Sequence, residues 1–320
     1  MTDHDQLRLT WPELPASIPA TVENILGGAV VEAHSQANGF SPGSADRVHA
    51  ANGRGAFVKA VSRERNSDTL DLHRRELAVL RMLPASLAVP RLLGFYDDGE
   101  WVALVIESIA GVHPREIPTL SEILAVLSAL ESLPKVRGGA GWAGVPDAVA
   151  ELVSAFAGWR SIRSAGRAEA LPACAYEHLD ELEQLAAGAV QVVDGDYLLH
   201  LDLRSDNILF DDTGRAWLVD WPWAGVGVRW LDALTFLLDA RLRGSDADVD
   251  EIIATHPLFA DADDHAINAV LSGLTAYFLD AAQKPAPENT PTLRAFQRAE
   301  GVAGLVWLGE RLGWKARERP

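Results

Sequence analysis

The sequence predicts an α+β chain, with a mostly antiparallel β part at the N-terminus and a mostly α-helical part after it. Residues 28–110 consist mainly of short β-branched runs between glycine and polar turns: "AVVEAHSQ", "ADRVHAANG", "AFVKAVS" and "WVALVIES". Long helical patterns replace these runs between residues 108 and 114. We therefore expect a first lobe over residues 1–107, a connection over 108–113 and a second lobe over 114–320.

One helix is expected inside the β-rich part, over residues 71–83, because Pro84 marks its end. Glu76 lies on its apolar stripe, between Leu72 and Leu80. A carboxylate facing inward needs a cation, because burial of an unpaired charge costs several kcal/mol. Lys59, on the preceding predicted strand, is the natural partner of Glu76.

The second part is expected to be a helical scaffold. "TLSEILAVLSALESL" places its leucines on one face, and Thr119 with Glu122 forms a capping box at the start of this helix. Further helical patterns cover residues 146–160, 176–190, 230–243, 264–283 and 291–312.

A β-rich island at residues 197–221, "YLLHLDLRSDNILFDDTGRAWLVDW", interrupts the helices. "NILF" and "AWLVD" are joined by "DDTG", which predicts a hairpin that brings Asp202 and Asn207 near Asp220. Carboxylate and amide oxygens are ligands that suit Mg²⁺. We expect Asn207 and Asp220 to bind metal and Asp202 to face an acceptor hydroxyl.

Composition limits the partners of this chain. A net charge of −17 and a pI near 4.9 disfavour nucleic acid and acidic membrane surfaces. The sequence has no apolar run of membrane-spanning length, and its start, "MTDHDQLRLT", does not resemble a secretion signal. The single cysteine, Cys174, cannot form an internal disulfide, so we expect a cytoplasmic protein. The oligomeric state stays open.

"HLDLRSDN" followed by "LVDW" resembles the catalytic loop and metal-binding aspartate of the aminoglycoside phosphotransferase and choline kinase family. The resemblance implies a two-lobed, protein-kinase-like fold and a kinase that transfers the γ-phosphoryl of ATP, or GTP, with Mg²⁺. Its acceptor would be a hydroxyl of an aminoglycoside-like antibiotic, a related sugar or an amino alcohol. Asp202 would be the catalytic aspartate, Asn207 and Asp220 the metal ligands, and His200 and Asp232 supports of the loop.

The same resemblance assigns the nucleotide site. Lys59, held by Glu76, would reach the nucleotide phosphates. "NGFSPGS" would cover the phosphates through Gly39, Ser41 and Gly43, whose backbone N–H groups can approach anionic oxygens. "VIESIAG" occupies the position of the hinge, where backbone groups would hydrogen-bond a purine edge; these residues are Glu107, Ser108 and Ile109.

The sequence departs from the family pattern at position 201, where Leu201 replaces the usual glycine. "WPW" follows Asp220 and no long activation segment is present, which disfavours a protein kinase. Two other functions stay open. A nucleotide-binding pseudokinase would keep the pocket without turnover, and a metal-dependent phosphoesterase would need neither the hinge nor the pair of Lys59 and Glu76.

Overall fold

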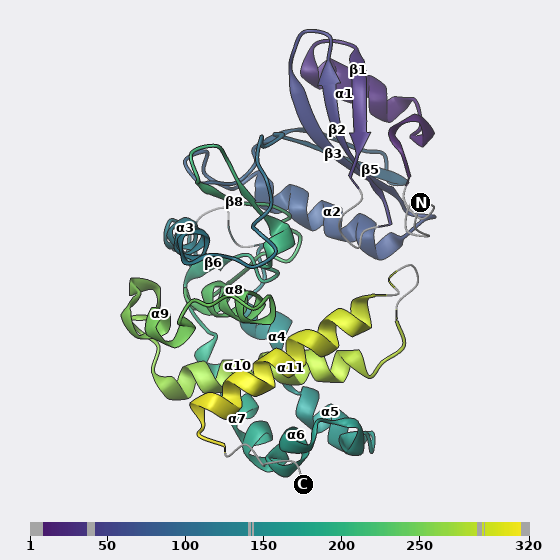
Figure 1. The fold of residues 1–320 in the computed structure, drawn as a ribbon. Coiled ribbons are helices and arrows are strands. Elements are labelled where there is room, and N and C mark those ends of the chain that lie inside the picture. The colour runs from purple at the N-terminus through teal and green to yellow at the C-terminus, as the bar shows by residue number, and fades with distance from the viewer. Residues whose placement is uncertain are drawn as a thin grey trace. The chain divides into compact units, whose positions relative to one another are not determined.

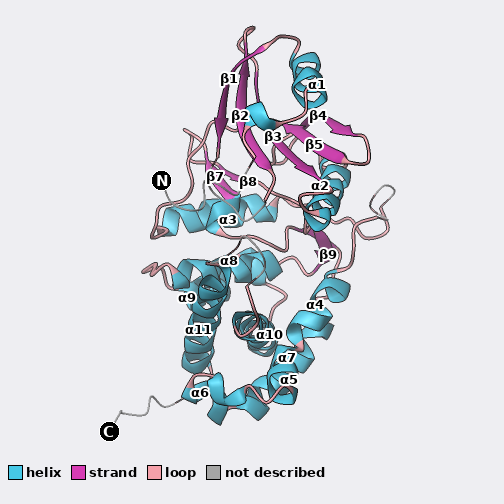
Figure 2. Ribbon diagram, turned by 90° about the vertical axis from the view of Figure 1, so that its right-hand side faces the viewer, coloured by secondary structure: helices cyan, strands magenta, loops and turns pink. Residues whose placement is uncertain are grey.

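The structure is a computed structural model that describes residues 9–36, 42–139, 142, 144–286, 290 and 292–314. It divides into two compact units (Figure 1). The first comprises Met1–Pro114 with Asp206–Ala224, and the second comprises Arg115–Ser205 with Gly225–Pro320. Strands lie side by side in the first unit, whereas helices form most of the second (Figure 2). The second unit also holds a small antiparallel sheet of β6 (Tyr197–Leu199) and β9 (Gly225–Gly227).

An antiparallel sheet forms the centre of the first unit and, among the described residues, has five strands in the order β1-β2-β3-β5-β4. Their bounds are β1 Val30–Ser35, β2 Ser44–Ala50, β3 Gly55–Ser62, β4 Leu92–Asp97 and β5 Trp101–Ile106. Four match predicted runs, and β4 was not expected. The turn after β4 is organised by Asp98, whose carboxylate accepts hydrogen bonds from the N–H groups of Glu100 and Trp101.

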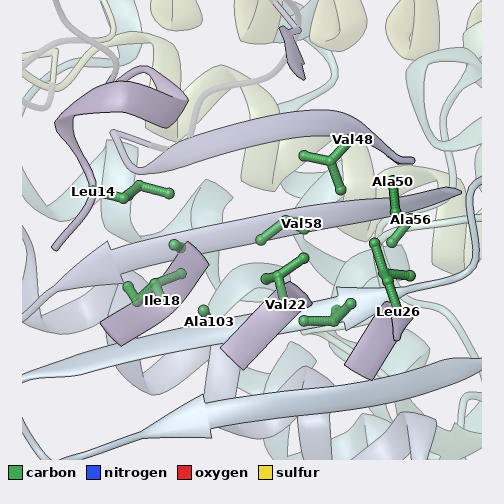
Figure 3. Packing of buried hydrophobic residues seen from close by; sticks show 11 residues of the cluster. Leu14, Ile18, Val22, Leu26, Val48, Ala50, Ala56, Val58 and Ala103 are labelled. Atoms are coloured by element: carbon green, nitrogen blue, oxygen red, sulfur yellow. The ribbon is translucent and has the colours of Figure 1, made fainter. Parts of the chain in front are cut away.

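Helix α1 (Ser17–Leu26), also unexpected from the sequence, covers one face of the sheet. Its buried side chains Ile18, Val22 and Leu26 pack with residues of β2, β3 and β5 (Figure 3). The small side chains of Ala60 and Ala103 lie in the same cluster, where they leave room for the helix. This apolar core fixes the position of β3.

Helix α2 (Ser67–Leu80) contacts β3, β4 and β5. It starts four residues before the predicted position because the Asn66 side chain accepts a hydrogen bond from the Thr69 N–H and caps the first turn. Side chains alternate along a strand, so Val58 points into the α1 core and Lys59 points to the face that carries α2.

The second unit contains helices that largely match the predicted pattern. The predicted capping box is present at the start of α3 (Leu120–Glu131), where Thr119 and Glu122 exchange hydrogen bonds. The pattern over 146–160 is divided into two helices, and α6 and α9 were not expected. The remaining helices are α4 Ala148–Phe156, α5 Gly158–Ser164, α6 Ala173–Glu177, α7 Leu179–Val192, α8 Leu231–Leu242, α9 Val249–Thr255, α10 Asp264–Ala282 and α11 Leu293–Arg311.

Helix α10 is the central helix of this unit and packs against α4, α5, α7 and α11. Trp159 on α5 is fully buried there, and its Nε1 donates to the Ser272 carbonyl and hydroxyl oxygens at 3.1 and 3.0 Å. Gly158 allows this close approach, because a Cβ at that position would lie 2.4 Å from the Ala276 carbonyl oxygen.

Replacement of Gly158 with alanine should therefore lower the free energy of unfolding by about 1–3 kcal/mol, because the new methyl overpacks the contact between α5 and α10. Gly188→Ala in α7 is the matched control, since its Cβ would meet only His265, at 3.9 Å. We expect the free energy of unfolding of Gly188→Ala to equal or exceed that of the parent, because alanine favours the helical conformation more than glycine does. Thermal unfolding of both variants checks this, and equal midpoints would contradict the packing.

Candidate active site

Lys59 on β3 forms the centre of a charged cluster in the first unit. Its Nζ donates to both carboxylate oxygens of Glu76, at 2.9 Å each, and to Asp220 Oδ1 at 2.7 Å. The ion pair predicted between Lys59 and Glu76 is thus present, and Asp220 is a third member that the sequence did not indicate. The Trp221 N–H also donates to Glu76 Oε1, at 3.3 Å.

Burial and charge decide the protonation of this cluster. Burial disfavours the charged form of Lys59, but the carboxylates of Asp220 and Glu76 outweigh it and hold the Lys59 pKa above its ordinary value. Burial raises the pKa of Glu76, whose side chain is only 2% exposed, and Lys59 opposes that shift. The cluster therefore holds a permanent ammonium.

His73 lies one turn before Glu76 on α2 and is buried. Burial and the charge of Lys59 lower the His73 pKa from 6.5 to about 4, so the ring is neutral at pH 7. In the unfolded chain His73 binds a proton below pH 6.5, whereas in the folded chain it does so only near pH 4. His73 therefore lowers the free energy of unfolding as the pH falls from 6.5 to about 4.

An NMR titration of the histidine side chains should show one ring that titrates near pH 4, and this signal should be missing in His73→Gln. A midpoint near 6.5 for the signal lost in that variant would contradict the described burial.

The predicted hairpin is present as β7 (Ile208–Phe210) and β8 (Ala216–Leu218). The Val219 N–H donates to the Asn207 carbonyl oxygen at 2.9 Å, which places Asn207 beside the residue that precedes Asp220. Asp220 has a φ of 68°, in the left-handed region, where a residue other than glycine is strained. Its side chain is 44% exposed.

The donor chemistry at the hairpin fits Mg²⁺. Asn207 supplies an amide oxygen and Asp220 a carboxylate, and both are hard ligands. In the part of the chain that the structure describes, no three His, Cys, Asp or Glu side chains gather closely enough to hold a metal ion by themselves. Mg²⁺ commonly takes only one or two carboxylates and completes its shell with waters and substrate phosphates, so a small protein donor set suits it.

In the second unit, Asp232 holds the first part of the loop that carries Asp202. Its buried carboxylate, on the first turn of α8, accepts from the His200 N–H at 2.6 Å and the Leu201 N–H at 2.9 Å. Burial raises the Asp232 pKa to about 6, against these two hydrogen bonds. Leu201 has a φ of 61°, which explains why glycine is usual at this position.

Asp239 holds the last part of the same loop, and sequence reasoning missed it. Its buried carboxylate accepts from the Ser205 N–H at 3.1 Å and from the Ser205 hydroxyl, and Arg243 pairs with it from the next turn of α8. Asp239 follows Asp232 by two helical turns in a mostly apolar helix, and that spacing is the signal that could have identified it.

Asp202 lies between these two supports, with its side chain 35% exposed. Its N–H donates to the buried His200 ring at 3.3 Å, so His200 has the supporting place that the resemblance implies. Arg204 Nε lies 3.4 Å from Asp202 Oδ1. The loop thus presents one partly exposed carboxylate on a firmly held backbone.

The phosphate-covering turn is described only in part, because Gly39 and Ser41 lie outside the described residues. Gly43 is described, and a Cβ there would lie 2.4 Å from the Ala60 carbonyl oxygen. The absence of a side chain at Gly43 is therefore required by its contact with β3.

Two backbone groups of the hinge segment already form hydrogen bonds within the protein. The Glu107 N–H donates to the Arg91 carbonyl oxygen at 2.8 Å, so Glu107 can offer only its carbonyl to a purine. The Glu107 carboxylate pairs with the Arg91 guanidinium. The Ile109 carbonyl accepts from Arg47 at 2.9 Å.

Comparison with known proteins decides the family. Residues 38–265, well over half of the chain, match the model of the APH phosphotransferase enzyme family. The chain belongs to this family. This confirms the resemblance stated from "HLDLRSDN" and "LVDW", and it makes the chain a small-molecule phosphotransferase enzyme.

Solved structures show the fold of this phosphotransferase. An aminoglycoside phosphotransferase from Alicyclobacillus acidocaldarius is 16% identical, with a TM-score of 0.54 over 94% of this chain and 97% of that chain. A thermostable mutant of APH(4)-Ia in complex with AMP-PNP and hygromycin B is 14% identical, with a TM-score of 0.59 over 95% of this chain and 100% of that chain. ADP-bound APH(2'')-Ib is 14% identical, with a TM-score of 0.52 over 91% of this chain and 99% of that chain. These likenesses confirm the predicted kinase-like fold.

No curated protein matches this phosphotransferase at a significant level. Among its described helices, none combines the length and apolar character needed to span a bilayer.

Proposed function

We propose that the chain transfers the γ-phosphoryl group of ATP, or GTP, to a hydroxyl of a small molecule with the help of Mg²⁺. The observation that carries this proposal is the ammonium of Lys59 held between Glu76 and Asp220 at the end of the hairpin. Phosphoryl transfer asks for little covalent chemistry from a protein, so positioning and charge neutralisation supply most of the catalysis.

The first unit supplies the nucleotide site in this proposal. Lys59 binds phosphate oxygens as a compact point charge, and Glu76 keeps the ammonium in place. Asn207 and Asp220 hold Mg²⁺, which supplies neutralisation of the phosphate charge when bound. Backbone groups of Gly39, Ser41 and Gly43 cover the phosphates, and the Glu107 carbonyl, Ser108 and Ile109 bind the purine edge.

The second unit supplies Asp202, which orients the acceptor hydroxyl and accepts its proton. Its backbone position is set by Asp232 and Asp239, which hold both ends of the loop. Two buried carboxylates bonded to loop N–H groups favour a single loop conformation, and this supports the proposed positioning.

The ligands bound in the similar structures support the substrate classes. APH(4)-Ia was solved with AMP-PNP and hygromycin B, and APH(2'')-Ib with ADP. We propose a nucleoside triphosphate as donor and, as acceptor, an aminoglycoside-like antibiotic, a related sugar or an amino alcohol. A single cysteine and an acidic composition favour a cytoplasmic enzyme that binds neither nucleic acid nor membrane.

A panel assay tests the proposal. ADP or GDP release is measured with Mg²⁺ and aminoglycosides, macrolides, amino sugars, choline and homoserine as acceptors. We expect acceptor-dependent release with at least one compound, and release that is at least ~10²-fold slower in Asp202→Ala. Tight nucleotide binding without release, with or without acceptor, would instead indicate a pseudokinase.

A further inference from the structure

Two helices of the second unit bring aromatic side chains next to the loop that carries Asp202. The Arg204 guanidinium, which pairs with Asp202, lies over the Phe296 ring of α11, with its Cζ 5.2 Å from the ring centre. Phe296 follows Arg204 by more than ninety residues, so the fold alone places this ring beside the loop.

Tyr277 on α10 belongs to the same surface. Burial and the charge of Asp202 raise the Tyr277 pKa, and Arg204 and Arg294 oppose that shift, so all three charged groups lie around the phenol. The buried Gln297 side chain lowers the Tyr277 pKa, and Gln297 Oε1 accepts from Arg294 Nη1 at 2.7 Å. Tyr277 is nevertheless 40% exposed, although it is large and partly apolar.

The charge balance of this surface differs from that of the whole chain, whose net charge is −17. Among the described residues that act on the Tyr277 phenol, the guanidiniums of Arg204 and Arg294 lie with the carboxylate of Asp202, and that carboxylate is already paired with Arg204.

Of the two carboxylates that follow these aromatic residues by one turn, one is paired with other cations and one is buried. Asp280, one turn after Tyr277, pairs with Arg167 at 2.7 Å and with Lys284 at 2.6 Å. Glu300, one turn after Phe296, is 2% exposed. Neither carboxylate presents its charge to a ligand beside Tyr277.

We propose that Tyr277, Phe296 and Arg294 determine acceptor specificity, and that the acceptor bears a neutral or anionic ring, not an ammonium, beside its reacting hydroxyl. An aromatic side chain packs well against the apolar face of a sugar or nucleoside ring. Among the described residues, an ammonium at this place would meet two guanidiniums and a carboxylate already paired with Arg204, which is a repulsive arrangement. The inference rests on the proposed function and narrows its acceptor classes.

Acceptors of similar structure but different charge test the proposed preference for a neutral or anionic ring. Phosphorylated product is measured by mass spectrometry with ATP and Mg²⁺. The acceptors are glucosamine, N-acetylglucosamine and glucuronate, with nucleosides as further uncharged rings and hygromycin B as a polycation. We expect kcat/KM to be at least about tenfold higher for a neutral or anionic compound than for its amine counterpart. A preference for amines, or no transfer to any neutral or anionic compound, would overturn the inference.

A charge reversal on α11 tests the residue assignment. Arg294→Glu should shift the ratio of neutral to cationic kcat/KM toward the cation by about tenfold, whereas a merely structural residue would alter both values alike. Arg298→Glu is the matched control, because Arg298 is an exposed arginine one turn later on the same helix. An unchanged ratio in Arg294→Glu, or equal shifts in both variants, would overturn the assignment.

A third readout separates this inference from the proposed function. Suppose that the parent enzyme hydrolyses the nucleotide with water as acceptor while Asp202→Ala does not. That result would support the phosphotransferase proposal even if the acceptor shows no preference for a neutral or anionic ring. Absence of both hydrolysis and transfer would overturn the two together.

Discussion

Asp202→Ala should lower turnover by at least ~10²-fold, with nucleotide binding largely retained. The expected loss follows from the position of this carboxylate, which lies partly exposed on a loop whose two ends are bonded to buried Asp232 and Asp239. Because Asp232 and Asp239 hold the backbone of the loop at both ends, removal of the Asp202 carboxylate should leave the loop in place.

The measurement is steady-state turnover with the best acceptor, together with nucleotide affinity by calorimetry. Asp202→Asn keeps the shape of the side chain and removes its basicity, so it should be as inactive as the alanine variant. Parental activity in either variant would contradict the role of general base, and loss of nucleotide affinity in both would assign Asp202 to binding instead.

Asp220→Ala should abolish metal-dependent nucleotide binding. Asp220 follows β8, and Asn207 immediately precedes β7, at the same end of the hairpin; the Asp220 carboxylate also contacts Lys59 at 2.7 Å. The variant removes the carboxylate ligand proposed for Mg²⁺ and leaves Lys59 paired with Glu76 alone.

Backbone strain complicates this variant, because Asp220 has a left-handed φ of 68° that alanine adopts at a cost of roughly 1–2 kcal/mol. Asp220→Asn accepts that conformation more readily and still removes the charge, so it separates strain from ligation. Asp212→Ala, an exposed aspartate in the turn of the same hairpin, is the matched control. Mg²⁺-dependent nucleotide binding of parental strength in Asp220→Asn and Asp220→Ala would contradict the assignment.

The features that the sequence predicted correctly depend on short-range patterns. The hairpin of β7 and β8 follows from two apolar runs around "DDTG", and the start of α3 follows from Thr119 and Glu122, three residues apart. The pair of Lys59 and Glu76 was predictable because a carboxylate on an apolar stripe requires a cation and the preceding strand offers one.

The features that it missed depend on tertiary contacts. Helix α1 is stabilised by packing on β2, β3 and β5, which no local pattern specifies. The contact of Asp220 with Lys59 spans 161 residues, and the bond of Ser205 to Asp239 links a loop to the helix after it. Likewise, the hydrogen bond that occupies the Glu107 N–H depends on Arg91, which immediately precedes β4, a strand that was not predicted.

The central claim is that Lys59, Glu76, Asn207 and Asp220 hold one nucleoside triphosphate with its Mg²⁺ while Asp202 faces the acceptor. A crystal structure with AMP-PNP and Mg²⁺ tests it most directly. We predict Lys59 Nζ within hydrogen-bond distance of a phosphate oxygen, and oxygens of Asn207 and Asp220 at about 2.1 Å from the metal. A nucleotide bound away from Lys59, or a metal ion with neither Asn207 nor Asp220 among its ligands, would contradict the account.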